Sequence, residues 1–119
     1  MKTEKILLAV TVLAASALTR FRMVSHSGGV PGLNGPVLGV ANADYDEGEQ
    51  AGVAVQGEIL VESGGPVSVG QMLATDAQGR AIRNNAGGKT CGIARDDASG
   101  TGEIIRMIAV ASGSTPPEV

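Results

Sequence analysis

Large aromatic rings are nearly absent from this sequence: of 119 residues, one is Phe, one is Tyr and none is Trp. Hydrophobic residues still make up 43% of the chain, so a core has to be built from Val, Ile, Leu, Met and Ala. The length leaves room for one domain with a thin core. Such a chain is stabilised more easily when it also buries surface against a partner or against copies of itself.

Side chains that carry catalysis or bind metals are also scarce. The chain has one His and one Cys, which are far apart in the sequence as His26 and Cys91. They form neither a zinc site nor a Cys–His catalytic pair. A single Cys excludes an internal disulfide, and the apolar flanks of Cys91 favour a buried thiol. We therefore expect no catalytic residue, no metal site and no cofactor, which is typical of a protein that is not an enzyme.

Three short patterns resemble ligand-binding motifs but have the wrong spacing. The acids at Asp44, Asp46 and Glu49 lack the Gly and the Glu that a calcium loop needs at its sixth and twelfth positions. Residues 100–103 lack the third Gly of a dinucleotide loop, and residues 87–90 lack the first Gly of a phosphate loop. Solvated turns explain all three patterns.

The chain has no excess of positive charge. Its net charge is −3, whereas a nucleic-acid binder normally carries a basic face, so we expect no direct contact with nucleic acid. The charge is unevenly placed, because residues 44–62 hold six acids and no Lys or Arg. The acidic middle could complement the mildly basic N-terminal segment of a neighbouring subunit. A solvated acidic loop is the alternative.

What the chain does have is glycine and β-branched residues. Eighteen glycines, without a collagen period, indicate frequent tight turns between short strands. Turn signals recur about every 8 to 12 residues, which is typical of a β-sandwich or β-barrel. No segment after residue 25 shows a helical stripe. The strand patterns lie at residues 37–41, 49–61, 67–76, 80–83, 90–94 and 103–110, and Gly52 and Gly57 are candidates for a bulge or a bend.

The organisation predicted along the chain has four parts. Residues 1–25 form an N-terminal strand pair or arm, and residues 26–36 form a loop rich in Gly and Pro. Residues 37–111 form the β-barrel core, and residues 112–119 form a flexible C-terminal tail without core-forming residues.

An internal similarity links two stretches of the predicted core. Leu38-Gly39-Val40-Ala41 precedes an Asp-rich turn and a Gly-Glu pair, and Cys91-Gly92-Ile93-Ala94 does the same. The offset is 53 residues at the start and 54 at the Gly-Glu pair, so the two turns differ by one residue. We expect two related hairpins that pack as two sides of a small barrel.

The N-terminal segment allows two interpretations. A basic start, an apolar run from Ile6 and small residues up to Ala17 resemble a secretory signal. The run is too short for a membrane-spanning helix. Glu4 and the β-branched residues favour a native strand instead, and residues 20–25 alternate as a second half-buried strand.

The ordered series of turn motifs resembles the capsid decoration, or cement, proteins of tailed bacteriophages. The series runs from the apolar N-terminal strands through Gly39-Val40-Ala41 and the Gly48-Glu49 strand entry. It continues with Asp76-Ala77-Gln78-Gly79-Arg80-Ala81, and it ends with Gly92-Ile93-Ala94 and Gly102-Glu103-Ile104-Ile105. The resemblance covers nearly the whole chain, and it favours a native N-terminal strand over a signal.

The resemblance implies an all-β fold, a small β-barrel or β-tulip-like domain of short strands with an extended N-terminal arm. It further implies a homotrimer on the outer surface of the virion capsid that stabilises contacts between major capsid protein subunits, with no membrane contact. The N-terminal arm and the Gly/Pro loop are the segments expected at capsid and subunit interfaces. The residues predicted there are Lys2, Lys5, Ile6, Leu8, Val10, Val12, Arg20, Arg22, His26, Val30 and Leu33.

The competing hypothesis is an exported β-domain of the periplasm or cell envelope, a binding module released by cleavage of the signal. Location discriminates between the two, because a cement protein sediments with DNA-filled heads. An exported module has a trimmed N-terminus and is found in the periplasm.

Overall fold

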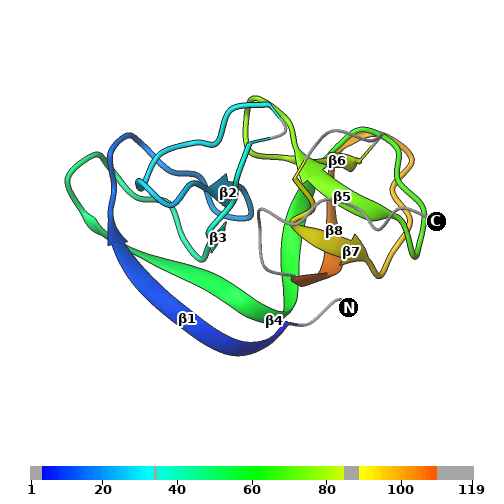
Figure 1. The fold of residues 1–119 in the computed structure, drawn as a ribbon, viewed down its shortest axis with the longest axis horizontal. Coiled ribbons are helices and arrows are strands. Elements are labelled where there is room, and N and C mark those ends of the chain that lie inside the picture. Colours follow the sequence, from blue (N-terminus) through cyan, green and yellow to red (C-terminus); the bar gives the residue numbers. More distant parts are fainter. Residues whose placement is uncertain (1–3, 34, 85–88, 110–119) are drawn as a thin grey trace.

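The structure is a computed structural model that describes residues 4–33, 35–84 and 89–109, and over these residues it is all-β (Figure 1). The prediction of an all-β fold is therefore confirmed. No helix in the described part of the chain is long and apolar enough to cross a membrane. The strands in chain order are β1 (Lys5–Leu13), β2 (Met23–Val24), β3 (Gly39–Ala41), β4 (Gln50–Gly64), β5 (Met72–Thr75), β6 (Ala81–Arg83), β7 (Gly92–Ala94) and β8 (Thr101–Ala109).

Five strands close into a β-barrel, as the sequence predicts. The pairing runs β4–β6–β5–β7–β8, and β8 then pairs with β4 to complete the circuit. All these pairs are antiparallel except β4–β6, which is parallel and consists of the single pair Ser63↔Ala81. The barrel is therefore held weakly at that one seam.

Strand β4 is the long element of the fold and bends at Gly57. The φ of Gly57 is 110°, a region that residues with a Cβ rarely adopt, and a Cβ there would collide with the carbonyl of Lys5. The pairing with β1 shifts register beside it, around Leu8. The bulge predicted at Gly57 is thus confirmed, whereas Gly52 pairs with Thr11 in regular register and is not a bulge.

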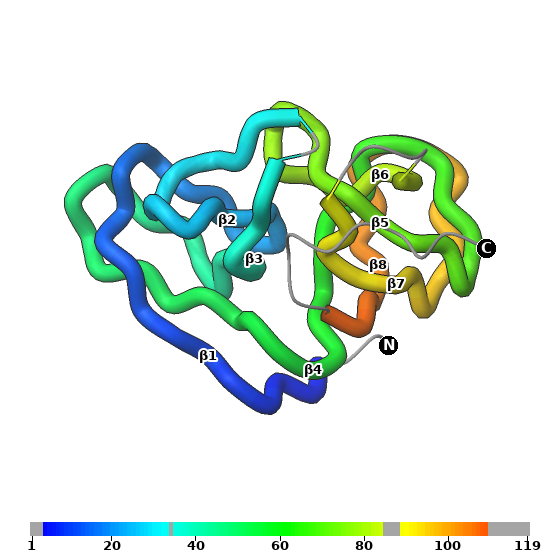
Figure 2. The backbone as a smooth tube through the Cα atoms, viewed as in Figure 1, coloured from blue at the N-terminus to red at the C-terminus, as the bar shows by residue number. Residues whose placement is uncertain are grey.

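The two N-terminal strands pair with other strands and not with one another. β1 runs antiparallel to β4, and β2 pairs with β3. In Figure 2, β1 follows β4 along one edge of the molecule, so the extended N-terminal segment is a strand of the sheet. The predicted tail at residues 112–119 and the predicted interface residue Lys2 lie outside the described residues.

The bend in β4 separates two units that have the same construction. The first unit (residues 5–55) contains β1, β2, β3 and the first half of β4. The second unit (residues 58–109) contains the second half of β4, then β5, β6, β7 and β8. In Figure 1 the two units lie side by side and β4 runs from one into the other.

The strand registers show that the units are repeats. Shifting β1 by 49 residues and the first half of β4 by 54 carries the pair Val12↔Ala51 onto Val61↔Ile105. The same shifts carry the pairs Ala9↔Ala54, Val10↔Val53, Thr11↔Gly52 and Leu13↔Gln50 onto Glu58↔Ile108, Ile59↔Met107, Leu60↔Arg106 and Glu62↔Ile104.

The shorter strands and the turns repeat in the same way. A shift of 49 for β2 and 53 for β3 carries Met23↔Val40 onto Met72↔Ile93 and Val24↔Gly39 onto Leu73↔Gly92. The isolated bridge Leu18↔Tyr45 becomes Val67↔Ala98. Backbone hydrogen bonds of the turns also recur. The bond from Phe21 N to Ala41 O corresponds to the bond from Gly70 N to Ala94 O, and that from Arg22 N to Thr19 O corresponds to that from Gln71 N to Ser68 O. The bond from Leu38 N to Val24 O likewise corresponds to the bond from Cys91 N to Leu73 O.

The internal similarity read from the sequence is therefore part of a larger repeat. Its two hairpins are β3–β4 and β7–β8, as predicted. They are not two sides of one barrel, because β3 lies outside the closed circuit and belongs to the first unit. The physical reason is the length of β4, which reaches through Gly57 and supplies a strand to each unit.

Each unit has its own hydrophobic core, and the two cores occupy equivalent positions. All but one member of the first core maps onto an apolar member of the second core; Ala14 maps onto the buried Ser63. The first set is Val10, Val12, Leu18, Val24, Leu38, Ala41, Tyr45, Ala51, Val53 and Val55, and the second is Ile59, Val61, Val67, Leu73, Cys91, Ala94, Ala98, Ile105, Met107 and Ala109.

The first unit covers the second at the weak seam of the barrel. Met23, Val40 and Ala54 point away from the first core and are buried in the second. The Glu62 N–H donates to the Phe21 carbonyl at 2.8 Å, and the Met23 N–H donates to the Gly79 carbonyl at 2.7 Å. The outer surface of the first unit thus completes the core of the second.

Candidate interaction surface

Large apolar side chains are exposed mainly on the first unit. In the described part of the chain, those that are exposed are Ile6, Leu7, Leu8, Leu13, Val30, Leu33, Val69 and Ile108. Six of the eight belong to the first unit. Scattered exposed apolar residues are common, but a group on one strand marks an interaction surface.

Four of these residues lie on β1. Leu7 is 80% exposed and Leu13 is 57% exposed, and Ile6 and Leu8 are exposed to a smaller extent, at 40% and 46%. The register shifts on either side of Leu8 break the regular alternation, so consecutive side chains from Ile6 to Leu8 all reach solvent. Among the described strands, β1 pairs with β4 alone and is an edge strand. Edge strands of this kind accept a further strand from a partner.

The Gly/Pro loop presents two more apolar side chains. Tight turns shape it, because the Gly28 N–H donates to the Ser25 carbonyl at 3.0 Å and the Gly35 N–H donates to the Gly32 carbonyl at 2.8 Å. Val30 lies between these turns and Leu33 lies within the second, and both are exposed. The loop also closes the first unit, since the Ala15 N–H donates to the Gly28 carbonyl at 3.0 Å.

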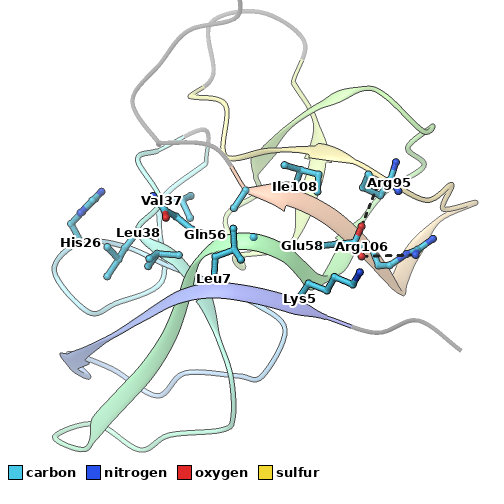
Figure 3. A pocket seen from close by; sticks show the side chains of 13 residues that line it. Lys5, Leu7, His26, Val37, Leu38, Gln56, Glu58, Arg95, Arg106 and Ile108 are labelled. Carbon is cyan, nitrogen blue, oxygen red and sulfur yellow. Dashed lines mark hydrogen bonds and ion pairs between the residues drawn. The ribbon is translucent and has the colours of Figure 1, made fainter.

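A cleft of about 990 Å³ lies beside the bend of β4 (Figure 3). Its walls come from β1, from the loop before β3 and from β8, and residues 55–58 of β4 contribute to its lining. Lys5, Leu7, His26, Leu38 and Ile108 all line it. The cleft is therefore mixed in character, with an apolar middle, His26 at one end, and Lys5, Arg95 and Arg106 at the other.

One end of the cleft holds an ion network. Arg95 Nε lies 3.2 Å from Glu58 Oε2, and Arg106 Nη2 lies 2.9 Å from Asp96 Oδ1. Arg106 also approaches Glu58, at 4.0 Å. The hydrogen bond and the charge of Asp96 raise the pKa of Arg106 above its ordinary value. This end is thus a fixed array of paired charges.

Two predicted interface residues, Lys5 and His26, both line this cleft, at its opposite ends (Figure 3). It places Ile6 and Leu8 on the exposed part of β1. Val10 and Val12 are partly buried and pack against the first core.

Both predicted arginines have partners within the chain. Arg20 stacks on the ring of Phe21, with 4.5 Å from Cζ to the ring centre, and its N–H donates to Asp44. Arg22 pairs with Glu62 at 3.3 Å and so links the two units. The acidic stretch and the basic N-terminal segment therefore complement one another inside one chain.

Sequence reasoning missed Leu7, Leu13 and Ile108. Leu7 and Leu13 belong to the apolar run at the N-terminus, and strict alternation along that run gives no sign of the bulge that exposes Leu7. Ile108 has the pattern of a buried strand residue. Its exposure depends on what covers the second unit, and no local signal reports that.

The described residues contain no group of three or more His, Cys, Asp or Glu side chains that could hold a metal ion. Cys91 is buried, as predicted, and its Sγ–H donates to the Leu73 carbonyl at 3.4 Å. Burial raises the pKa of Cys91 to about 12, so the thiol is not ionised near neutral pH.

The sequence matches a family model of phage cement proteins over residues 1–110. The chain therefore belongs to the phage cement protein family, and it is a phage head decoration protein. This confirms the resemblance found in the turn motifs.

Among solved structures, the chain is similar to the crystal structure of the head fiber gp8.5 N base of bacteriophage phi29. The TM-score is 0.73 at 23% sequence identity, and the match covers 88% of this chain and 95% of that chain. The likeness shows a shared fold. No curated protein matches the sequence significantly.

Proposed function

We propose that this chain is a homotrimeric cement protein that binds the outer surface of the mature phage head and stabilises contacts between major capsid protein subunits. The observation that carries the proposal is the exposed apolar part of β1, on an edge strand of a protein of the phage cement family. Burying Ile6, Leu7 and Leu8 against a capsid subunit would remove apolar surface from water, which favours association.

The partner contact proposed for β1 is strand addition. A capsid segment that pairs with the outer edge of β1 would gain backbone hydrogen bonds, and the exposed Leu7 and Leu8 would add apolar side-chain contacts with the capsid. Lys2, Lys5 and His26 are proposed to flank this contact, and Val30 and Leu33 to form a second one. Arg20 and Arg22 contribute to these contacts indirectly, by holding their loops in place.

The proposed stabilisation is an effect of mass action. A protein that binds the expanded shell and not its precursor shifts the equilibrium toward the expanded shell by its differential affinity. The fold suits this role, because the strands of the second unit already close on one another, whereas the first unit keeps an edge strand for contacts. Binding across a seam then resists separation of the subunits on either side.

The test uses heads that lack the protein. Purified wild-type chain is added to mature heads and to unexpanded precursor shells, and the bound fraction is measured after sedimentation. Mature heads should bind a saturating number of copies and should release their DNA at a higher temperature once occupied. Equal binding to both shells, or binding without any thermal effect, would contradict the proposed stabilisation.

The mass of the chain in purified heads tests the exported alternative. Residues 5–13 pair with β4, and Val10 and Val12 cover the first core. Removing residues 1–17 would uncover that core, so we expect the protein in heads to retain β1. A mature chain that begins near Leu18 would refute this account and support export.

A further inference from the structure

The repeat offers a template for a contact that a single chain leaves unused. Inside the chain, the outer row Met23, Val40 and Ala54 of the first unit is buried against the second unit, at 1 to 2% exposure. The equivalent row of the second unit is Met72, Ile93 and Ile108, from the registers given above. Met72 and Ile93 are half-buried and Ile108 is 39% exposed. Over the described residues, the second unit thus presents the same kind of surface less covered than its counterpart, and Ile108 opens onto the cleft beside β1.

The opposite side of the contact is covered in the second unit and left partly open in the first. In the second unit, Ile59 and Val61 are buried in the core that the row of the first unit completes. Their equivalents on β1 are Val10 and Val12, which are only partly buried. Leu13, equivalent to the half-buried Glu62, is exposed.

From these two observations we infer that a second copy of this chain docks head to tail. The row Met72, Ile93 and Ile108 of one copy packs on the C-terminal half of β1 of the next, repeating the contact that joins the two units inside each chain. The inference deepens the self-association included in the proposed function, since it names the two faces. It does not depend on capsid binding.

The backbone supports the same docking. Inside the chain, the Glu62 N–H donates to the Phe21 carbonyl. Phe21 has a φ of 69°, which is unusual for a residue with a side chain, and its equivalent Gly70 has a φ of 88°. Gly70 therefore has the left-handed backbone of its counterpart, and it is exposed. In the proposed complex, the Leu13 N–H donates to the Gly70 carbonyl of the second copy.

The chemistry of the two contacts differs at one place. Arg22 and Glu62 form an ion pair between the units, and their equivalents are Gln71 and Leu13. The contact between copies is therefore uncharged where the internal contact is ionic. Salt screens ionic contacts and leaves apolar ones intact, so association should persist at high salt.

Head-to-tail contacts close into rings or continue as chains, because each copy uses two different faces. Closure after three copies would place six units in a ring, in which contacts within one chain alternate with contacts between two chains. A two-fold dimer, in which both copies use the same face, is the arrangement that this geometry excludes.

The test measures native mass in the absence of capsids, over a range of concentrations and in low and high salt. Wild-type chain should form a complex larger than a monomer in both salts. L13K and I108K each place a charge on one face, and each should be monomeric with an unchanged far-ultraviolet spectrum. L33K, which changes an exposed leucine of the Gly/Pro loop, is the matched control and should associate like wild type.

The native mass of a mixture of the two variants tests the inference most directly. Each retains one intact face, so L13K and I108K together should form a one-to-one heterodimer and nothing larger. A wild-type chain that is monomeric at every concentration, single variants that associate normally, or a mixture that stays monomeric would each overturn the inference. Binding of L13K to heads is measured separately, and its result bears on the capsid contact alone.

Discussion

Ile59 in the second unit and Val10 in the first occupy equivalent positions on equivalent strands. Ile59 is buried beneath a row of side chains from the first unit, whereas Val10 remains partly exposed. The same contrast holds for Val61 and Val12. Two units with one pairing pattern therefore differ because the chain covers the open side of the second unit and leaves the equivalent side of the first unit partly exposed.

The comparison teaches where stability and binding are located. The second unit has a closed barrel, and its core also takes in Met23, Val40 and Ala54 of the first unit. The first unit has an edge strand and most of the exposed apolar residues. A duplicated unit can in this way separate the two tasks, since one copy is completed inside the chain and the other keeps a partly open surface that a partner could cover.

The largest expected effect compares the two core positions directly. I59A should destabilise the isolated chain by about 2–5 kcal/mol, because it removes a fully buried side chain and leaves a cavity. V10A should cost less than half as much, because water already reaches Val10. Thermal unfolding of both variants at low concentration measures the difference, and equal losses would contradict the asymmetry of the two units.

The next effect concerns the equivalent glycines Gly39 and Gly92. A Cβ at Gly39 would collide with the backbone carbonyl of Ala54, whereas a Cβ at Gly92 would lie 2.7 Å from Met107 Sδ, which can move, and 2.9 Å from the Ile108 carbonyl. G39A and G92A should each destabilise by about 1–3 kcal/mol, as overpacked cores do. Chemical denaturation should show the larger loss of stability for G39A. A G39A variant as stable as wild type would argue against the close approach of Gly39 to the Ala54 backbone.

Alkaline pH should affect the second unit through Cys91, whose equivalent in the first unit is Leu38. Burial raises the pKa of Cys91 from 9.0 to about 12, so above pH 9 the unfolded chain loses a proton that the folded chain keeps. Stability is therefore complete below pH 9 and falls by about 1.4 kcal/mol per pH unit between 9 and 12.

The measurement is the free energy of unfolding from pH 8 to 11 for wild type and C91V. The loss should be smaller in C91V, which has no thiol to ionise, and the groups that titrate in both chains cancel in the difference. Parallel pH curves for the two chains would show that Cys91 is not buried as described.

The smallest expected effect compares the residues at the contact between the units. E62Q removes the charge that pairs with Arg22 at a partly exposed site, so it should cost about 0.5 kcal/mol. L13A, at the equivalent exposed position, should leave the stability of the monomer unchanged. The loss in E62Q should disappear in high salt, and a loss that is independent of salt would assign it to packing.

Turn chemistry made much of the fold predictable from the sequence. Gly and Asp residues in the turns located the strands from β3 onward to within a few residues, except that β5 is shorter than its pattern. Asp76 caps the predicted turn, because its carboxylate accepts hydrogen bonds from the backbone N–H groups of Gln78 and Arg80. The Gly57 bulge followed from a glycine inside a strand pattern. The similarity around Gly39 and Gly92 indicated related hairpins.

What the sequence concealed depends on contacts between distant segments. Arg22 lies 40 residues from Glu62, and no local pattern links them. The exposure of Leu7 follows from register shifts that belong to the pairing of β1 with β4, and not to β1 alone. The sharing of β4 between the units depends on its continuity through a bend that the sequence shows only as one glycine.

The central claim is that the first unit carries the contact with the phage head. The most direct measurement is the number of copies bound per mature head for wild type, L7K and A77K, where Ala77 is an exposed position of the second unit. L7K should lose most of its occupancy while its melting temperature stays the same, and A77K should bind like wild type. Full occupancy by L7K, or an equal loss in A77K, would contradict the claim.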